Sequence, residues 1–196
     1  MNLFRWAAPV YHHLVDPRRS GEDAAVIAAR LRPYLPPGGH LLDVGGGTGA
    51  IAARLAGALH ARVTVLDPSP DMLAHVPRHP ALTAVYGAAE DMPFPDAAFD
   101  AALVSDAFHH FRDQDAAARE IARVVRLGGG VLVLEMDPNG WTRVVVAAER
   151  LLGEPGRFFA PVELRAFLAQ RRIEGRWQAE AGASYSILGT VNRNTE

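Results

Sequence analysis

Two residue types are missing from this chain of 196 residues: cysteine and lysine. All 20 basic residues are arginine. Without lysine the chain has no phosphate-binding lysine of the P-loop type and cannot form a Schiff base with a substrate. Without cysteine it has neither a thiolate nucleophile nor a cysteine-bound metal site. These two absences exclude several enzyme classes before any fold is considered.

Long apolar runs and concentrated positive charge are also missing. No stretch approaches the roughly 18 apolar residues that a membrane-spanning helix needs, and the N-terminus lacks the pattern of a signal peptide. The formal net charge is -2 at pH 7, and no run of arginines forms the basic stripe typical of nucleic-acid-binding proteins. We therefore expect a cytoplasmic protein with no membrane insertion and no nucleic-acid partner. The oligomeric state stays open, with a homodimer as one option.

The sequence does contain a regular alternation of strand and helix patterns. With 49% hydrophobic residues, the chain is long enough for one domain, residues 1–196, and too short for two. The expected strands are residues 41–44, 62–67, 82–86, 99–104 and 131–135, and the expected helices between them are residues 50–58, a short helix from 70, and residues 113–126. This alternation predicts an α/β fold in which helices cover both faces of a parallel sheet.

The segments outside this alternation have separate expected roles. Residues 1–19 are expected to form an N-terminal lid, and Ser20 is expected to cap the helix that follows. Residues 138–160 are expected to form a substrate-cap insert above the strand ends, with a helix over 141–152. After a helix over 161–170, the strands expected at residues 173–179 and 184–191 would form an antiparallel hairpin at the sheet edge.

The glycine-rich segment after the first strand is the most informative part of the chain. Gly45, Gly46 and Gly47 are consecutive, and Gly49 follows Thr48. Glycines have no Cβ, so backbone N–H groups in this turn can approach a ligand closely. The helix after the turn would add free N–H donors and a partial positive charge at its N-terminus. Together these features are typical of a nucleotide-type site.

The glycines alone leave the nucleotide undecided, because Gly45, Gly47 and Ala50 also fit the dinucleotide pattern G-x-G-x-x-G/A. Asp67 lies about 20 residues further on, where the ribose-binding acid of such a site belongs. Asp43 favours a different ligand. A dinucleotide-binding strand normally carries an apolar residue at this position, whereas a carboxylate suits a ligand with a positive group, such as the ammonium of S-adenosylmethionine.

Five sequence blocks occur in the order typical of one enzyme family. They are Leu41–Gly49, Val65–Leu73, Ala89–Asp96 with Phe99-Asp100, His109–Phe111 and Leu127–Gly130. Through these blocks the chain resembles the class I S-adenosylmethionine-dependent methyltransferases, of the small-molecule branch that includes enzymes of menaquinone and ubiquinone biosynthesis. The resemblance implies a Rossmann-like, doubly wound sheet of seven strands, mostly parallel, with S-adenosylmethionine as cofactor.

The resemblance also implies how the methionine and ribose parts of the cofactor are held. Asp43 and the glycine turn would hold the methionine end, the turn residues being Gly45, Gly46, Gly47, Thr48 and Gly49. Asp67 would accept hydrogen bonds from both ribose hydroxyls. Pro68 and Met72 would pack on the two faces of the adenine.

Recognition of the adenine edge is implied for the loop after the third strand. Ala89 would donate its backbone N–H to the adenine ring. The family often has Asp at the position of Ala88, as an acceptor for the adenine amino group. In this chain that hydrogen bond is missing or is made by Glu90 or Asp91.

Methyl transfer requires few catalytic groups, because the departing sulfur needs no proton and alignment alone can supply roughly 7 to 11 kcal/mol. Ligands bind at the carboxyl ends of the strands in such sheets, so Ser105 and Asp106 should face the cofactor. His110 is the candidate base, because its ordinary pKa of about 6.5 suits proton abstraction, and Tyr11 is a second candidate in the lid. Purely structural roles for His110, Tyr11 and Asp106 stay open.

The predicted function is methyl transfer from S-adenosylmethionine to a small apolar or aromatic acceptor, at oxygen, nitrogen or activated carbon. Acceptor chemistry that needs an enzyme thiol is excluded, since cysteine is absent. Two alternatives stay open, an NAD(P)-dependent oxidoreductase and a protein that binds S-adenosylmethionine without turnover. No metal site is expected, because Pro77 breaks the helix that would align His75 with His79.

Overall fold

The computed structural model describes residues 19–139, 142, 157–181 and 184–193. Most of the expected lid and of the expected substrate-cap insert, including the helix predicted over 141–152, lies outside these residues. In the described part of the chain, no helix is both long and apolar enough to cross a bilayer.

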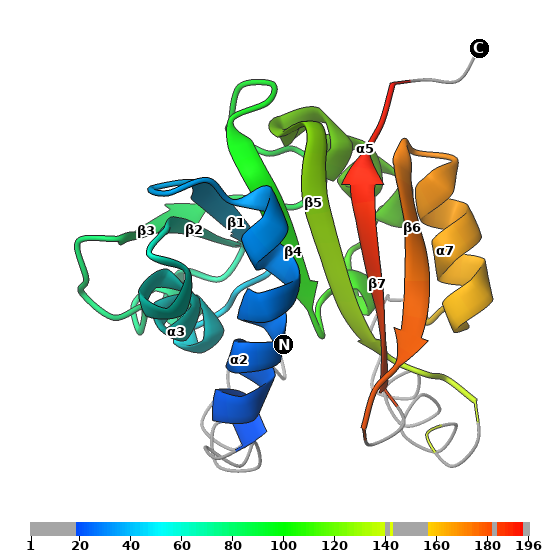
Figure 1. The fold of residues 1–196 in the computed structure, drawn as a ribbon, viewed down its shortest axis with the longest axis horizontal. Helices are drawn as coiled ribbons and strands as arrows, with labels where there is room; N and C mark the ends of the chain where they lie inside the picture. The colour runs from blue at the N-terminus through cyan, green and yellow to red at the C-terminus, as the bar shows by residue number, and fades with distance from the viewer. Residues whose placement is uncertain (1–18, 140–141, 143–156, 182–183, 194–196) are drawn as a thin grey trace.

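Seven strands of the described residues form one sheet in the order β3-β2-β1-β4-β5-β7-β6 (Figure 1). They are β1 (His40–Val44), β2 (Arg62–Asp67), β3 (Leu82–Tyr86), β4 (Phe99–Ser105), β5 (Val125–Met136), β6 (Ile173–Ala179) and β7 (Ser184–Val191). The first five strands pair in parallel, whereas β7 pairs antiparallel with both β5 and β6. The expected mostly parallel sheet with an antiparallel C-terminal hairpin is confirmed.

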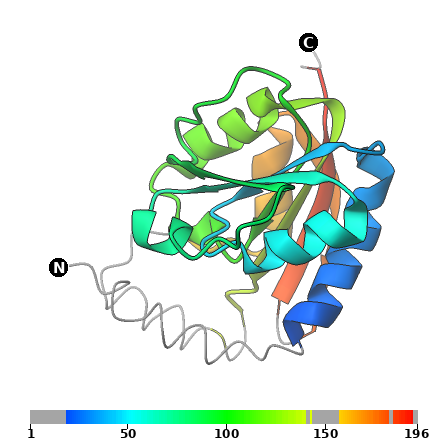
Figure 2. The ribbon, with the colours of Figure 1, turned by 90° about the vertical axis from the view of Figure 1, so that its left-hand side faces the viewer.

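Helices cover both faces of the sheet, as Figures 1 and 2 show. They are α2 (Arg19–Leu31), α3 (Ala50–Leu59), α4 (Pro70–Leu73), α5 (Gln114–Val124) and α7 (Pro161–Ala169), with short 3₁₀ turns η1 (Arg32–Tyr34) and η2 (Phe108–His110). Buried residues of α2 and α3 pack with Leu41, Val63 and Leu103 on one face. Those of α5 and α7 pack with Leu42, Val104 and Val133 on the other. Consecutive residues of β1 thus pack into the cores on opposite faces of the sheet, as expected for a strand with helices on both faces.

The strand order reverses between β1 and β4, because the chain leaves β1 toward β2 and β3 and then returns to the other side of β1. Ligands of open α/β sheets bind at such a switch point, outside the carboxyl ends of the strands. The glycine turn after β1 and Ala107, which follows β4, meet at this place. The fold therefore puts the candidate site where the sheet topology predicts it.

The junction of α5 with β5 and the start of α2 differ from the sequence prediction by two residues or more. The helix expected over 113–126 ends at Val124, and β5 begins at Val125 instead of Val131. Val125 pairs with Phe99 of β4, and the strand pairing shifts register between Phe99 and Ala101. Gly129 permits this close approach, because a Cβ there would lie 2.6 Å from the carbonyl oxygen of Asp100. The strand thus runs through the three glycines that had been expected to precede it.

The second difference concerns the start of α2, where Ser20 was expected to be the N-cap. Ser20 already has helical backbone, since α2 as described begins at Arg19. The short helix α4 follows its prediction more closely. Ser69 caps it by accepting a hydrogen bond from the Met72 N–H at 3.3 Å, and Pro70 occupies its first position.

Candidate functional site

The glycine turn is fastened to the neighbouring strand β2 by its own backbone. The N–H groups of Gly45 and Gly46 both donate to the carbonyl oxygen of Leu66, at 2.8 and 3.2 Å. Gly45, Gly47 and Gly49 all have φ between +55 and +71°, a conformation that favours glycine over residues with a Cβ. The turn then enters α3 at Ala50, so a helix N-terminus opens into the same space.

Asp43 lies directly beneath this turn. Its side chain is almost fully buried, with 3% of the residue exposed. A Cβ on Gly46 would lie 2.5 Å from the Asp43 Oδ2 atom, so only glycine allows the turn to rest on the carboxylate. Burial, and then the nearby charge of Asp67, raises the pKa of Asp43 to about 7. Burial and the charge of Asp67 therefore disfavour the ionised form of this acid near neutral pH.

Asp67 closes the other side of the turn from the end of β2. Its Oδ2 atom accepts a hydrogen bond from the Gly47 N–H at 2.9 Å, and its Oδ1 atom accepts one from the Ser69 N–H at 2.8 Å. Burial raises the pKa of Asp67 in spite of these two hydrogen bonds. Each carboxylate oxygen keeps a second lone pair, so hydroxyl groups of a ligand can still donate to it.

The two acids make the space around the turn favourable to a cation. Each carboxylate is buried, and the charge of Asp67 raises the pKa of Asp43. A positive ligand group would relieve this repulsion, whereas a pyrophosphate would add negative charge to it. The glycine backbone, the helix N-terminus and the two acids together could hold a nucleoside that carries an amino acid. The site thus fits the cofactor that the sequence resemblance implied.

The other residues expected to contact the cofactor lie in the turn, in the segment after Asp67, or in the loop after β3. Pro68 is exposed and Met72 is half-buried, so apolar surface lies beside Asp67. Thr48 is half-buried within the turn. The loop after β3 begins next to Asp67, because the Gly87 N–H donates to the carbonyl oxygen of Asp67 at 3.3 Å. This contact brings the loop that carries Ala89 to the edge of the site.

Ala89 and Glu90 lie differently within this loop. Ala89 is buried in the apolar core. The Glu90 Oε1 atom accepts hydrogen bonds from the N–H groups of Arg112 and Asp113, at 2.8 and 3.3 Å. One carboxylate oxygen of Glu90 is therefore directed to the segment that precedes α5, where it joins two loops.

The segment after β4 lies against the first glycine of the turn. A Cβ on Gly45 would lie 2.7 Å from the Ala107 Cβ. Ser105 ends β4 half-buried, and Asp106 is exposed with a φ of +50°. A non-glycine residue in this conformation is strained, and such residues cluster at functional sites. Ser105 and Asp106 thus lie directly before the residue that contacts the glycine turn, and their contact with the cofactor stays a prediction.

The two histidines of η2 differ in their surroundings. The His109 Nδ1 atom lies 2.6 Å from the Glu135 Oε2 atom, with both side chains buried. The Glu135 Oε1 atom accepts a hydrogen bond from the Phe108 N–H at 2.8 Å. The His109 ring also stacks on Phe158, with 4.3 Å between the ring centroids. His109 is thus held by a carboxylate on one side and an aromatic ring on another.

His110, the candidate base predicted from the sequence, lies beside His109 with 3.9 Å between the ring centroids. Burial, and then the proximity of His109, lowers the pKa of His110 to about 4. His110 is therefore neutral at physiological pH and a weak base. Tyr11, the second candidate, lies outside the described residues. Within those residues, no group of three or more His, Asp or Glu side chains is arranged to hold a metal ion.

Glu135 is the site residue that the sequence analysis missed. Its signal was present, because a carboxylate at the carboxyl end of a buried parallel strand is placed like Asp43 and Asp67. What the sequence could not show is that β5 lies next to β4, which brings Glu135 to His109 from 26 residues away.

Comparison with known proteins finds matches along the same blocks. A family model described as a methyltransferase domain matches residues 42–133. The ubiquinone/menaquinone biosynthesis C-methyltransferase UbiE of Rubrivivax gelatinosus is 40% identical over 106 residues, which are 53% of this chain and 42% of that protein. The chloroplastic 2-methyl-6-phytyl-1,4-hydroquinone methyltransferase of Arabidopsis thaliana is 32% identical over 144 residues, 71% of this chain and 43% of that protein.

A solved structure extends the comparison to almost the whole chain. This structure is the complex between the Haloferax volcanii Trm112 methyltransferase activator and a protein termed a methyltransferase. One chain of it superposes on the present chain with a TM-score of 0.84. The match covers 98% of both chains at 17% identity, and at this identity it shows a shared fold. The chain spans less than half the length of the two curated relatives named above.

Proposed function

Because residues 42–133 match a methyltransferase domain, we propose that the chain is a class I S-adenosylmethionine-dependent methyltransferase, which transfers a methyl group from this cofactor to a small apolar or aromatic acceptor. The matches to a methyltransferase domain and to UbiE support the resemblance seen in the sequence and the cofactor expected from it. The observation that carries the proposal is the pair of buried acids, Asp43 and Asp67, on either side of the glycine turn. Their surroundings suit a ligand that combines a cationic group with a ribose.

In this proposal Asp43 binds the ammonium of the cofactor, together with backbone N–H groups of the turn. Asp67 accepts the ribose hydroxyls through its free lone pairs, and Pro68 and Met72 enclose the adenine. The loop at Ala89 faces the adenine edge. An NAD(P)-dependent oxidoreductase fits less well, because its pyrophosphate would lie on a turn flanked by two carboxylates.

When bound, S-adenosylmethionine supplies an electrophilic methyl group whose transfer leaves a neutral thioether. The chain then has to hold the acceptor in line with that methyl group and, where necessary, remove a proton from the acceptor. Ser105 and Asp106 border the place where the acceptor would meet the cofactor. Ala107, which directly follows them, packs on Gly45 and so ties the position of this segment to that of the turn.

The paired histidine, His109, is the stronger candidate for the base. Glu135 holds its Nδ1 atom, which orients the ring and stabilises an imidazolium after proton transfer, as a carboxylate does in catalytic triads. His110 also remains a candidate, although its pKa of about 4 gives it little driving force as a base. Tyr11 would act from the lid over the site.

The proposed acceptor is a hydroquinone or a similar electron-rich ring. The names of the two curated relatives describe quinone-pathway and hydroquinone substrates. The buried ring of Phe158 stacks on His109, and that of Phe159 packs near Phe108 of η2, so the surroundings of the candidate base are aromatic. The proposal further includes a cytoplasmic location and a small-molecule partner instead of a nucleic acid.

The test is transfer of label from methyl-labelled S-adenosylmethionine into an extract of small molecules and into a panel of hydroquinones and phenols. The proposal expects label in an apolar aromatic product. Binding of the cofactor without transfer to any acceptor would support the alternative of a binding protein without turnover. Failure to bind the cofactor at all would contradict the proposal.

A further inference from the structure

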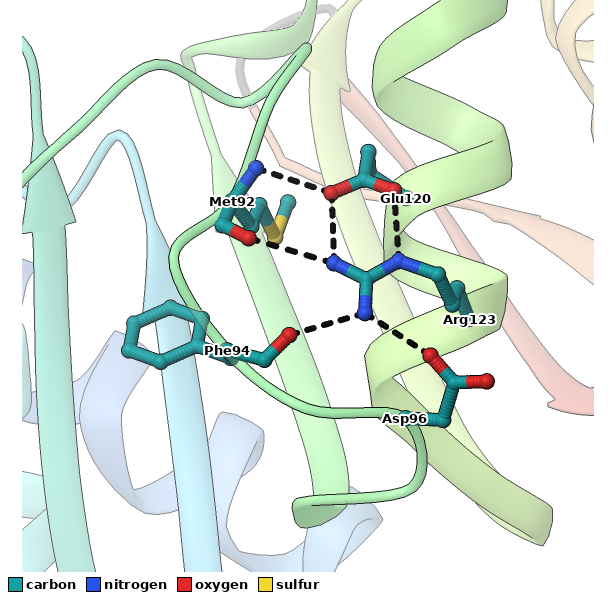
Figure 3. A network of polar contacts seen from close by, with 5 residues as sticks. All are labelled: Met92, Phe94, Asp96, Glu120 and Arg123. Atoms are coloured by element: carbon teal, nitrogen blue, oxygen red, sulfur yellow. Dashed lines mark hydrogen bonds and ion pairs between the residues drawn. The ribbon is translucent and has the colours of Figure 1, made fainter.

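A second polar network joins the loop after β3 to helix α5 (Figure 3). The Arg123 guanidinium pairs with both oxygens of Glu120, three residues earlier on the helix, at 2.6 and 2.7 Å. It also donates to the carbonyl oxygens of Met92 and Phe94, at 3.1 and 2.8 Å, and to the Asp96 Oδ1 atom at 2.9 Å. These bonds use all five N–H donors of the arginine.

The network holds the backbone of the loop at one residue in particular. The Met92 N–H donates to the Glu120 Oε2 atom at 2.8 Å, and the Met92 carbonyl oxygen accepts a hydrogen bond from Arg123. The Met92 side chain is buried in the core. Both backbone polar groups of Met92 and its side chain are thus fixed. Only a planar, forked cation can bridge a carboxylate and two carbonyls in this way, so lysine would not replace Arg123.

The loop held in this way begins at the proposed cofactor site. Tyr86, the last residue of β3, is paired in register with Asp67, and Gly87 is hydrogen-bonded to Asp67. Residues 88–91 form a short turn between this contact and Met92, closed by the Asp91 N–H, which donates to the Ala88 carbonyl oxygen at 3.3 Å. The turn is therefore anchored at one end beside the proposed ribose acid and at the other on α5.

We propose that Glu120 and Arg123 are positioning residues that set the discrimination of this site for adenine over other bases. The inference rests on the proposed function, which places the adenine edge against residues 88–91. Selection of one base requires that the backbone groups and side chains facing it are held in place before the ligand binds. The clamp formed by Glu120 and Arg123 fixes the end of the turn that is not already anchored at Asp67.

The test compares two ligands, S-adenosylhomocysteine and S-inosylhomocysteine. The second differs from the first in that a carbonyl group replaces the adenine amino group. Their dissociation constants are measured by calorimetry for the wild type, Arg123→Gln and Glu120→Gln. Each variant is expected to bind S-adenosylhomocysteine about tenfold more weakly, the equivalent of one positioned hydrogen bond. Affinity for S-inosylhomocysteine should change little, so the ratio of the two constants falls.

The matched control is Arg119→Gln. Arg119 lies on the same helix and pairs only with helix residue Asp115 among the ion pairs of the described chain, so its loss should leave the ratio unchanged. Arg123→Lys, which keeps the charge but not the fork, should fall between the wild type and Arg123→Gln, and it replaces Arg123→Gln if that variant does not fold. Equal weakening of both ligands, or an unchanged ratio with a lower unfolding temperature, would overturn the inference. If the wild type binds neither ligand, the proposed function itself fails.

Discussion

At the scale of single residues, the proposed binding of the cofactor ammonium by Asp43 would make affinity depend on pH. In the free protein the pKa of this acid is raised to about 7, and a bound ammonium would lower it again. At neutral pH about half of the free molecules carry this proton, so binding should release about half a proton per ligand, and affinity should fall up to about tenfold per pH unit below the free pKa. Calorimetry in buffers of different ionisation enthalpy measures the released proton. Equal affinity at pH values of about 6 and 8 would contradict this role of Asp43.

The same shift implies that Asp43 lowers the stability of the ligand-free protein. The unfolded chain loses the proton near the ordinary pKa of an aspartate, whereas the folded chain keeps it up to about pH 7. The free energy of unfolding therefore falls as pH rises between these two pKa values. Asp43→Asn cannot ionise, so at pH values above 7 the variant should unfold at a higher temperature than the wild type. It should also bind S-adenosylhomocysteine more weakly, and a lower unfolding temperature would show that the carboxylate is stabilising.

The two histidines of η2 can be separated by substitution. His109→Asn removes the imidazole paired with Glu135 and should lower kcat by about 100-fold if that ring is the base. The dissociation constant of S-adenosylhomocysteine serves as the control for an intact cofactor site and should stay within a few-fold of the wild type. A larger loss of kcat in His110→Asn than in His109→Asn would return the role of base to His110.

At the scale of elements, the turn between β1 and α3 tolerates no side chain at its centre. Gly46→Ala would place a Cβ 2.5 Å from the Asp43 carboxylate and 2.9 Å from the Val65 Cγ1 atom. Either the turn or the acid has to move, and we expect cofactor affinity to fall at least about tenfold. Thermal unfolding and ligand titration measure the two effects.

The control for this substitution is Gly57→Ala, in the exposed part of α3. No atom lies within 4 Å of a Cβ at Gly57, and its φ is not positive. Alanine should stabilise the helix by about 0.5 to 1 kcal/mol and leave affinity unchanged. Similar affinity losses in Gly46→Ala and Gly57→Ala would mean that the packing of Gly46 on Asp43 has no special role.

Element boundaries were predictable where the sequence itself contains the reason for them. Ser69 and Pro70 specify the start of α4, and the strands over residues 82–86, 173–179 and 184–191 match their predictions. The end of α5 was not predictable, because Val124 and Val125 fit a helix face and a strand equally well. What decides between them is the pairing of Val125 with Phe99, which is a tertiary contact.

At the scale of the whole molecule, the sheet order assembles a site from residues far apart in the sequence. The sequence motifs indicated Asp43, the glycines and Asp67, because each lies in a block with a recognisable pattern. The sequence did not indicate Glu135 as the partner of His109, or the clamp of Glu120 and Arg123 on Met92. Both depend on which strand or helix lies beside which loop. A single sequence contains no local signal for such neighbours.

The central claim is that the buried acids around the glycine turn select a cationic nucleoside over a dinucleotide. The most direct measurement is a pair of calorimetric titrations of the wild-type protein, one with S-adenosylhomocysteine and one with NAD under the same conditions. We predict saturable binding of S-adenosylhomocysteine, weakened in Asp43→Asn, and no measurable binding of NAD. Binding of NAD without binding of S-adenosylhomocysteine would contradict the account.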